Sequence, residues 1–496
     1  MNTVADRPQI DVARQRAVVA ALAAFLPERA LLYEREDVQP YECDGLTAYR
    51  RLPMVVALPE TEAEVQRILK ACHALRVPVV ARGAGTGLSG GALPPGDGVL
   101  LSLARFMRIL DIDPAVRTAR LQPGVRNLAI SDAAAQYGLY YAPDPSSQIA
   151  CSIGGNVAEN SGGMHCLKYG LTVHNILKLR AFTIEGELIE IGGDGLDSAG
   201  YDLLALITGS EGLLAVITEV TVKLLPKPER AQCILAAFDD VAQAGTAVVN
   251  IIAAGIIPAA LEMMDKITTG AVEPFVHAGY PLDAAAILLC ESDGNEAEVA
   301  EEIERMKTVM QASGATVVRV SASEAERNRF WAGRKAAFPA AGRISPDYYC
   351  MDGTIPKKAL PRVLNAITAL SLKYGLRCMN VFHAGDGNLH PLILYDANQP
   401  GELEKTEQFG AEILKLSIDV GGTITGEHGV GVEKIDAMCL QFRTTELEMF
   451  HRVKAAFDQH ALLNPGKAVP TLHRCAEYGR MHVHGGQEKF PDLPRF

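Results

Sequence analysis

Two histidines and a Glu–His pair further along carry the residue types of a metal-assisted reaction. His383 and His390 lie in MNVFHAGDGNLHPLILY, and Glu427–His428 lies in GGTITGEHGVGVEK. In the first stretch, β-prone apolar runs flank Asp386–Gly387, a pair typical of a two-residue hairpin turn. That turn predicts that residue 383 pairs directly with residue 390. The two imidazoles would then share one face, with Cβ atoms ~5 Å apart.

This spacing suits one divalent metal ion with Glu427 as a third, oxygen ligand, and such a set fits zinc, manganese or iron. Gly426, Gly429 and Gly431 predict a flexible turn that lets the Glu427 and His428 side chains converge on one pocket. His428 would stand beside the metal as an unligated base that takes a proton from a hydroxyl group. The alternative is a hairpin with two structural histidines and an unrelated loop glutamate.

The composition is that of an ordinary globular protein and excludes some partners. The chain has 496 residues, of which 48% are hydrophobic and 21% charged, enough for two or three domains. Its net charge of −12, without a basic run, argues against nucleic acid as a partner. The ten cysteines form no C-x-x-C motif, which indicates neither an iron–sulfur cluster nor a cysteine zinc site. We expect a cytoplasmic protein that reaches a membrane only through partners.

Strand and helix patterns divide the chain into three parts. They alternate over 55–130, where Thr61 begins a capped helix. Pro226 and Pro228 mark a boundary. A second block of mixed α/β pattern covers 229–436, and the segment 437–496 begins with a helical pattern. We therefore predict units at 1–228 (core about 51–228), 229–436 and 437–496.

A glycine-rich loop follows a strand at residue 82. Gly85–Gly90 matches G-x-G-x-x-G, but the chain then runs into Pro94 and Pro95, which cannot lie inside the helix that a Rossmann site requires. What remains is a long loop whose backbone N–H groups face an anion. A second loop at 143–170 repeats the composition. Together the two loops would grip a large, flat, phosphorylated cofactor; the alternative is two unrelated structural loops.

Six separated motifs resemble a known family. They are RGAGTGLSGGALP, the 141–175 segment around SIGGNVAENSGG, LITGSEGLLAVITEVTVKLLP, HAGDGNLHPLI, GEHGVG and LNPGK. They resemble flavoproteins of the vanillyl-alcohol-oxidase fold and, among these, the D-2-hydroxy-acid dehydrogenases, above all the FAD-binding D subunits of bacterial glycolate oxidases. The similarity extends to the tail TLHRCAEYGRMHVH. It implies an α+β protein whose FAD-binding domain has two α/β subdomains, followed by an α/β cap domain that carries the metal site and a C-terminal helical segment that returns to the FAD-binding domain.

The resemblance also implies which residues contact FAD. The first loop should wrap the pyrophosphate, the second should run past the isoalloxazine and ribityl chain, and others should line the adenine end or return to the flavin domain. These residues are Arg82, Gly83, Ala84, Gly85, Thr86, Gly87, Leu88, Ser89, Gly90, Pro143, Ser152, Gly154, Gly155, Asn156, Asn160, Gly163, Glu211, Gly212, Ile217, Asn464 and Lys467. Some relatives attach FAD through a histidine in the first loop. Thr86 stands near that place, so we expect non-covalent FAD, with His165 and Cys166 as the other possible anchors.

By the same resemblance, His383, His390 and Glu427 bind the metal, His428 is the catalytic base, and Arg334 holds the substrate carboxylate. Relatives that oxidise larger diacids carry a lysine just before the segment matching Met351–Pro356. Here that stretch reads Tyr348-Tyr349-Cys350, which favours a small monocarboxylate such as glycolate or D-lactate, unless Arg343 substitutes for the lysine. The α-carbon hydride would pass to flavin N5.

The reduced flavin must be reoxidised, and the chain has no cluster of its own. The resemblance implies flavin-fold and iron–sulfur partner subunits of a glycolate oxidase complex. The alternatives are a stand-alone D-lactate or D-2-hydroxyglutarate dehydrogenase, a non-redox enzyme of the same fold such as an ether-lipid synthase, and a non-catalytic FAD-binding subunit.

Overall fold

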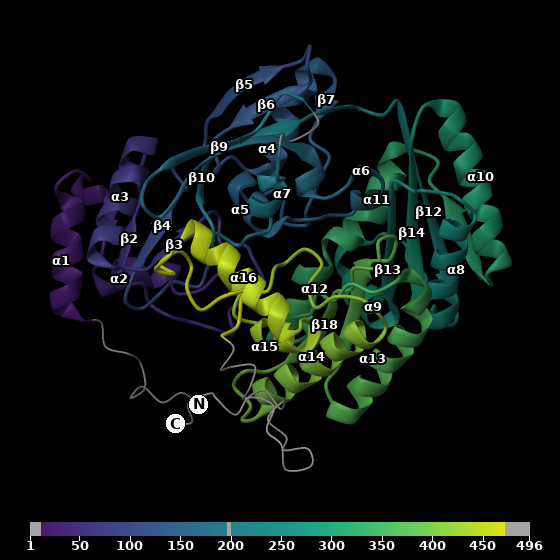
Figure 1. The fold of residues 1–496 in the computed structure, drawn as a ribbon. Coiled ribbons are helices and arrows are strands. Elements are labelled where there is room, and N and C mark those ends of the chain that lie inside the picture. Colours follow the sequence, from purple (N-terminus) through teal and green to yellow (C-terminus); the bar gives the residue numbers. More distant parts are fainter. Residues whose placement is uncertain (1–10, 196–199, 472–496) are drawn as a thin grey trace.

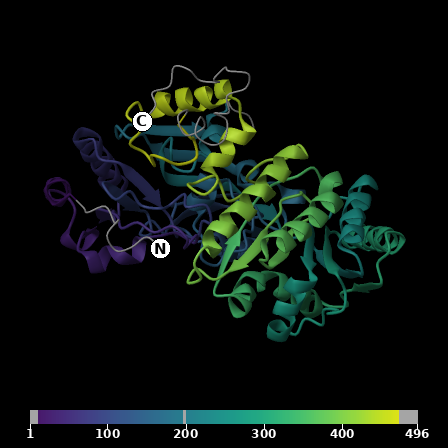
Figure 2. The ribbon, with the colours of Figure 1, turned by 90° about the horizontal axis from the view of Figure 1, so that it is seen from below.

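A computed structural model describes residues 11–195 and 200–471, and its elements form two halves. Figure 1 shows the first half in purple to blue and the second in teal to green, and Figure 2 shows the two halves side by side from below. The first ten residues, a short segment at 196–199 and the tail from 472 lie outside the described residues. No helix among the described residues is long and apolar enough to cross a membrane.

The first half opens with a four-stranded sheet in the order β1-β2-β4-β3, in which β2, β3 and β4 are parallel. Thr61 caps α3 and forms a capping box with Glu64, as the sequence predicts. One apolar face of α3 is buried, with Val65, Ile68 and Leu69 in the core of this subdomain. The elements are α1 (Val12–Ala23), β1 (Leu31–Leu32), α2 (Arg35–Val38), β2 (Val55–Ala57), α3 (Glu62–Leu75), β3 (Val79–Arg82) and β4 (Val99–Ser102).

A second, antiparallel sheet follows in the order β5-β6-β10-β8-β9, and β7 pairs with β11 apart from it. The segment predicted as the second glycine-rich loop contains two short helices, α5 and α6. Ser152 caps α5 by accepting from the Gly155 N–H. The elements are β5 (Ile109–Asp113), β6 (Thr118–Leu121), α4 (Asn127–Ala134), β7 (Leu139–Tyr140), α5 (Ile153–Glu159), α6 (Cys166–Tyr169), β8 (Ile176–Phe182), β9 (Leu188–Gly192), α7 (Leu203–Ile207), β10 (Val216–Lys223) and β11 (Leu225–Pro226).

The second half is built on a seven-stranded antiparallel sheet in the order β15-β12-β14-β13-β17-β18-β16. Both faces are covered: Ile234 and Ala236 of β12 lie in one core cluster, and Cys233 and Leu235 lie in another on the opposite face. The elements are β12 (Arg230–Phe238), α8 (Val241–Ala253), β13 (Ala260–Asp265), α9 (Lys266–Val276), β14 (Ala286–Gly294), α10 (Glu296–Ala312), β15 (Val317–Val320), α11 (Glu324–Lys335), α12 (Ala337–Ile344), β16 (Asp347–Cys350), α13 (Leu360–Tyr374), β17 (Cys378–His383), β18 (Pro391–Tyr395) and α14 (Glu402–Asp419).

The C-terminal segment leaves the second half and returns to the first. Helices α15 (Ile435–Gln441) and α16 (Thr444–Phe457) are drawn in yellow in Figures 1 and 2. Beyond them, Leu463 forms a parallel bridge with Val79 of β3, and the Asn464 N–H donates to the Val79 carbonyl at 2.8 Å. The segment thus extends the first sheet beside the strand that leads into the glycine loop.

Candidate active site and metal centre

A cavity of about 490 Å³ is lined by residues from both halves of the molecule. The first half contributes residues 81–88 of the glycine loop, residues 145–161 in part, and residues 210–217 in part. The second half contributes Lys335, Phe338 and Pro339 around the end of α11, together with His390 and Glu427–His428. The predicted cofactor loops therefore face one space with His390, Glu427 and His428, whereas His383 and Arg334 are not among the lining residues.

Most of the predicted cofactor residues line this cavity. They are Arg82, Gly83, Ala84, Gly85, Thr86, Gly87, Leu88, Ser152, Gly154, Gly155, Asn156, Glu211, Gly212 and Ile217. The others are not among its lining residues: Ser89, Gly90, Pro143, Asn160, Gly163, Asn464 and Lys467. Neither His165 nor Cys166 lines it, and His165 is instead held by Asp144 at 2.8 Å.

Several of these other residues support the lining loops from behind. The side chains of Asn464 and Lys467 both donate to the Gly91 carbonyl, at 3.0 and 2.8 Å. Lys467 also lies on a larger cavity of about 980 Å³, which is lined by no other predicted site residue. Glu211, which does line the first cavity, accepts from the Val430 and Gly431 N–H groups at 2.7 Å each and so holds the loop after His428.

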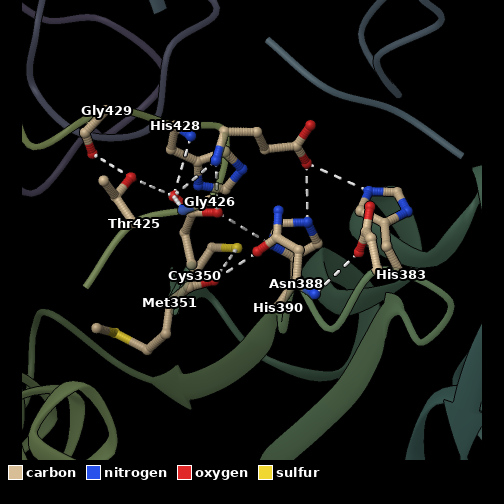
Figure 3. Close-up of polar contacts among 12 residues, drawn as sticks. Cys350, Met351, His383, Asn388, His390, Thr425, Gly426, His428 and Gly429 are labelled. Atoms are coloured by element: carbon tan, nitrogen blue, oxygen red, sulfur yellow. Dashed lines mark hydrogen bonds and ion pairs between the residues drawn. The ribbon is translucent and has the colours of Figure 1, made fainter. Parts of the chain in front are cut away.

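The predicted metal ligands meet at one carboxylate oxygen. Glu427 Oε1 lies 3.2 Å from His383 Nε2 and 2.9 Å from His390 Nε2. Figure 3 labels the two histidines and draws their polar contacts as dashed lines. His383 and His390 are both buried, and one ligand atom of each residue lies within 4.8 Å of the others. Burial alone would raise the pKa of Glu427, but the two imidazoles hold it well below its usual range.

The predicted hairpin register is wrong by two residues. Asn380 pairs with Pro391 and His383 forms a bridge with Asn388, so His383 and His390 are diagonal neighbours, not direct partners. The connecting turn is longer than two residues because the Gly387 N–H donates to the His383 carbonyl across it. A shift of two residues keeps both side chains on one face, and their ring centroids lie 5.1 Å apart.

A second set, made of Cys350, His390 and His428, also has its ligand atoms within 4.8 Å. The Cys350 thiol is engaged with the Met351 carbonyl at 3.4 Å. His390 presents Nδ1 to the same carbonyl at 3.3 Å, which leaves Nε2 toward Glu427. The set of two histidines and Glu427 therefore has the better-directed donor atoms, and His428 stays outside it.

His428 is held beside this set as an unligated imidazole. Its ring stacks on that of His390 with centroids 4.9 Å apart, and its Nδ1 is buried without a hydrogen-bond partner among the described residues. Burial lowers the pKa of His428 to about 4, although the Asp352 carboxylate opposes the shift. The imidazole is therefore neutral near neutral pH, which is the form a proton acceptor needs.

Asp352 organises the loop that carries Glu427 and His428. Its Oδ2 accepts from the N–H groups of Gly426 and His428, both at 3.0 Å, and from the Thr425 hydroxyl at 2.6 Å. Burial works against ionisation of Asp352, but the Lys434 ammonium group 3.3 Å away opposes it, and the pKa of this carboxyl lies below its usual range. The converged geometry expected for Glu427 and His428 thus rests on a buried anion as well as on glycine flexibility.

Arg334 is buried at the end of α11 with a free guanidinium edge. Its Nε donates to Glu262 Oε2 at 2.7 Å, while Nη1 and Nη2 are buried without a hydrogen-bond partner among the described residues. Arg334 is only 1% exposed and is therefore not an ordinary charge on a helix surface. Arg343, the suggested substitute cation, is exposed over the Phe275 ring and does not line the cavity.

Three residues of this region were missed from the sequence. Glu262 and Asp352 are carboxylates in otherwise apolar or buried segments, ALEMMD and CMDGTI. A carboxylate in such a segment is the feature of the sequence that could have identified each of them as a residue of the site. Lys335 follows Arg334 directly and is an exposed cation on the cavity lining. Nothing in its spacing distinguishes it from an ordinary surface lysine.

The chain matches known flavoprotein families and relatives along most of its length. Residues 53–192 match the family described as FAD binding domain, and residues 227–468 match FAD linked oxidases, C-terminal domain. The chain is 63% identical to glycolate oxidase subunit GlcD of Escherichia coli K12, over 99% of this chain and 97% of the relative. It is 32% identical to a D-lactate dehydrogenase of Anaerostipes hadrus, over 89% of this chain and 94% of the relative.

Among solved structures, p-cresol methylhydroxylase superposes with a TM-score of 0.78 at 16% identity, covering 94% of this chain and 99% of that one. This likeness confirms the predicted fold, with an FAD-binding part followed by a cap. The two family matches and the near-complete alignment with the bacterial relative confirm the predicted family. The chain therefore belongs to the FAD-linked oxidases, in the group that contains the glycolate oxidase subunit GlcD.

Proposed function

We propose that this FAD-dependent oxidoreductase oxidises a small 2-hydroxy acid, glycolate to glyoxylate and also D-lactate to pyruvate. The observation that carries the proposal is a single cavity lined by the glycine loop, His390, Glu427 and His428, with His383 Nε2 facing the same Glu427 oxygen at 3.2 Å. The names of the relatives from Escherichia coli and Anaerostipes hadrus support these two substrates.

The lining of the cavity fits FAD held without a covalent bond. Glycine backbone lines much of it, and two glycines have no room for a larger residue: a Cβ on Gly83 would lie 2.3 Å from Ser152 Oγ, and one on Gly154 would lie 2.5 Å from Pro123 Cβ. Thr86 stands where some relatives carry a linking histidine. We assign residues 1–228 to the FAD-binding domain, 229–436 to the substrate domain and 437–496 to the returning segment.

The donor set also fits a divalent metal ion such as zinc, manganese or iron. Two imidazole Nε2 atoms and one carboxylate oxygen converge, and Glu262 engages the other nitrogen of His383 at 2.7 Å. Such an outer carboxylate is usual for a metal-binding histidine. We therefore assign His383, His390 and Glu427 as the ligands.

In the proposed reaction, Arg334 binds the substrate carboxylate with Nη1 and Nη2, since its Nε is occupied by Glu262. His428 takes the proton of the 2-hydroxyl group, in the neutral form that its burial favours. When bound, the metal ion would supply a Lewis acid for the hydroxyl group, and FAD would supply the acceptor for the α-carbon hydride.

We also infer that the chain works as one subunit of a complex, since its relative is named as a subunit of glycolate oxidase. Electrons would leave through partner subunits, one with a related flavin fold and one with iron–sulfur clusters. A stand-alone D-2-hydroxy-acid dehydrogenase is the second candidate. Lys335 on the cavity lining favours keeping the diacid D-2-hydroxyglutarate among the substrates to be tested.

Anaerobic mixing with substrate tests the proposal. The purified flavoprotein is mixed with glycolate, D-lactate, L-lactate or D-2-hydroxyglutarate while the visible flavin band is recorded. We expect bleaching by glycolate and D-lactate and none by L-lactate. Absence of bleaching by all four, in protein that contains both FAD and metal, would refute the proposed oxidation by the isolated chain.

The close approach of Gly154 to Pro123 predicts a loss of FAD on substitution. In Gly154→Ala the new Cβ would meet the rigid Pro123 ring and its carbonyl at 2.5 and 3.0 Å, so the loop must shift and the ratio of flavin to protein should fall. The control is Gly270→Ala in α9, where a Cβ meets no atom within 4 Å. That variant should keep its flavin and gain about 0.5–1 kcal/mol of stability. Equal flavin content in both variants would contradict the prediction.

A further inference from the structure

One buried carboxylate joins the predicted metal ligand to the predicted substrate clamp. Glu262 lies on β13, directly opposite His383 of β17 in the antiparallel sheet, and is 1% exposed. Its Oε1 lies 2.7 Å from His383 Nδ1, and its Oε2 accepts from Arg334 Nε at 2.7 Å. Each oxygen therefore has one partner, and each partner has a separate role in the proposed reaction.

Burying a carboxylate in the middle of a sheet is costly unless its charge is paired and hydrogen-bonded. Arg334 provides the opposite charge. An apolar pair at positions 262 and 334 would serve a purely structural purpose at lower cost, because buried ion pairs contribute little net stability. The position of Glu262 therefore points to a role in the site.

The contact with His383 fixes the tautomer of that ring. A carboxylate next to Nδ1 keeps a proton on Nδ1, so Nε2, which faces Glu427 Oε1 at 3.2 Å, is the nitrogen left to bind a metal ion. The contact with Arg334 fixes the guanidinium in the same way. With Nε occupied, only the Nη1 and Nη2 edge is free to bind a substrate carboxylate in bidentate fashion.

We propose that Glu262 is a positioning residue that sets the metal-binding ring of His383 and the carboxylate-binding edge of Arg334 in one fixed relation. This inference rests on the proposed function, since it assigns Glu262 a role toward the ligand set and the clamp of that reaction. Glu262 does not itself touch the reacting atoms. It aligns the group that holds the hydroxyl end of the substrate with the group that holds its carboxylate end.

Glu262→Gln tests this role because glutamine has one acceptor and one donor, whereas both partners are donors. If the new amide faces His383, the ring must carry its proton on Nε2 and loses the lone pair for the metal. If it faces Arg334, two donors oppose each other. We expect a 10–100-fold loss of metal affinity, the size typical of outer-sphere partners, together with a higher KM for the hydroxy acid.

Glu291 provides a matched control on the neighbouring strand β14. It is also 1% exposed and also binds α11, through Arg327 at 3.0 and 3.1 Å, but it contacts neither His383 nor Arg334. Metal affinity is measured by calorimetric titration of chelator-treated, flavin-loaded protein, with the melting temperature recorded for each variant. Glu291→Gln should lose stability yet keep wild-type metal affinity and KM.

The outcomes separate the inference from the function on which it rests. Wild-type protein that neither binds a metal nor is bleached by any hydroxy acid would overturn the proposed function. If the wild-type protein binds a metal and is bleached, and Glu262→Gln has the same metal affinity and KM, the role of Glu262 is overturned. The same conclusion follows if Glu262→Gln and Glu291→Gln lose metal affinity and raise KM equally. If Glu262→Gln does not fold, Glu262→Asp replaces it: the shorter carboxylate keeps the charge but cannot reach both donors, so the same losses are expected.

Discussion

Replacing His428 by asparagine should leave a yellow protein that binds FAD but oxidises glycolate about 10²–10⁴-fold more slowly, the usual contribution of a positioned base. Asparagine has no group that takes up a proton near neutral pH. It leaves the backbone N–H of residue 428 free to donate to Asp352, so the loop should keep its shape. Turnover is measured with an artificial electron acceptor, and the flavin content is read from the visible spectrum of the same sample.

The control for this variant is His451→Asn on α16. The His451 Nε2–H group donates to the Pro470 carbonyl at 3.0 Å, and His451 does not line the cavity. Its replacement should leave turnover unchanged. Undiminished turnover in His428→Asn, with FAD bound, would show that another group removes the hydroxyl proton.

Glu427→Gln should abolish metal retention and turnover together while FAD remains bound. Glu427 Oε1 is the atom that both imidazoles face, and an amide oxygen carries no charge to hold a divalent ion there. The loss of metal affinity should be at least the 10–100-fold that follows from removing outer-sphere partners alone. Metal content after dialysis and the rate of flavin bleaching are the two measurements.

Chelation of the wild-type protein gives the internal comparison. Removal of the metal should stop the bleaching, and addition of zinc, manganese or iron should restore it, whereas Glu427→Gln should not respond to added metal. A Glu427→Gln protein that keeps its metal through dialysis and reacts at the wild-type rate would exclude Glu427 from the ligand set.

The pattern of side chains predicted which face the two histidines share, but not their register. Faces follow from the period of two along a strand, and a register wrong by two residues leaves His383 and His390 on the same side. The register itself depends on contacts from outside the hairpin. β17 also pairs with β13, where His383 lies opposite Glu262. The sequence of residues 379–395 alone cannot reveal that pairing.

The fold and the cofactor loops were predictable because several complete sequence motifs resembled those of a known family. The single residues that hold the site together were not. Asp352 and Glu262 come from segments 75 and 121 positions away from Glu427 and His383, the residues whose positions they set. A lone carboxylate in an apolar stretch indicates that it has a buried partner, yet only the folded chain shows which one. Similarly, Asn464 and Lys467 lie near the glycine loop as predicted, but they bind its backbone from behind.

Ser89 links the cofactor loop to the loop of the base, and this has a consequence for how the holoenzyme assembles. Its carbonyl accepts from the N–H groups of both Val432 and Glu433, at 3.0 and 3.1 Å. An apoprotein whose glycine loop is loosened would therefore also lose part of the frame around His428. We expect amide hydrogens at 428–433 to exchange faster in flavin-free than in flavin-loaded protein; equal exchange would contradict this. Binding of FAD would then act as a maturation step, because it would position the His428 base only in chains that already hold the electron acceptor.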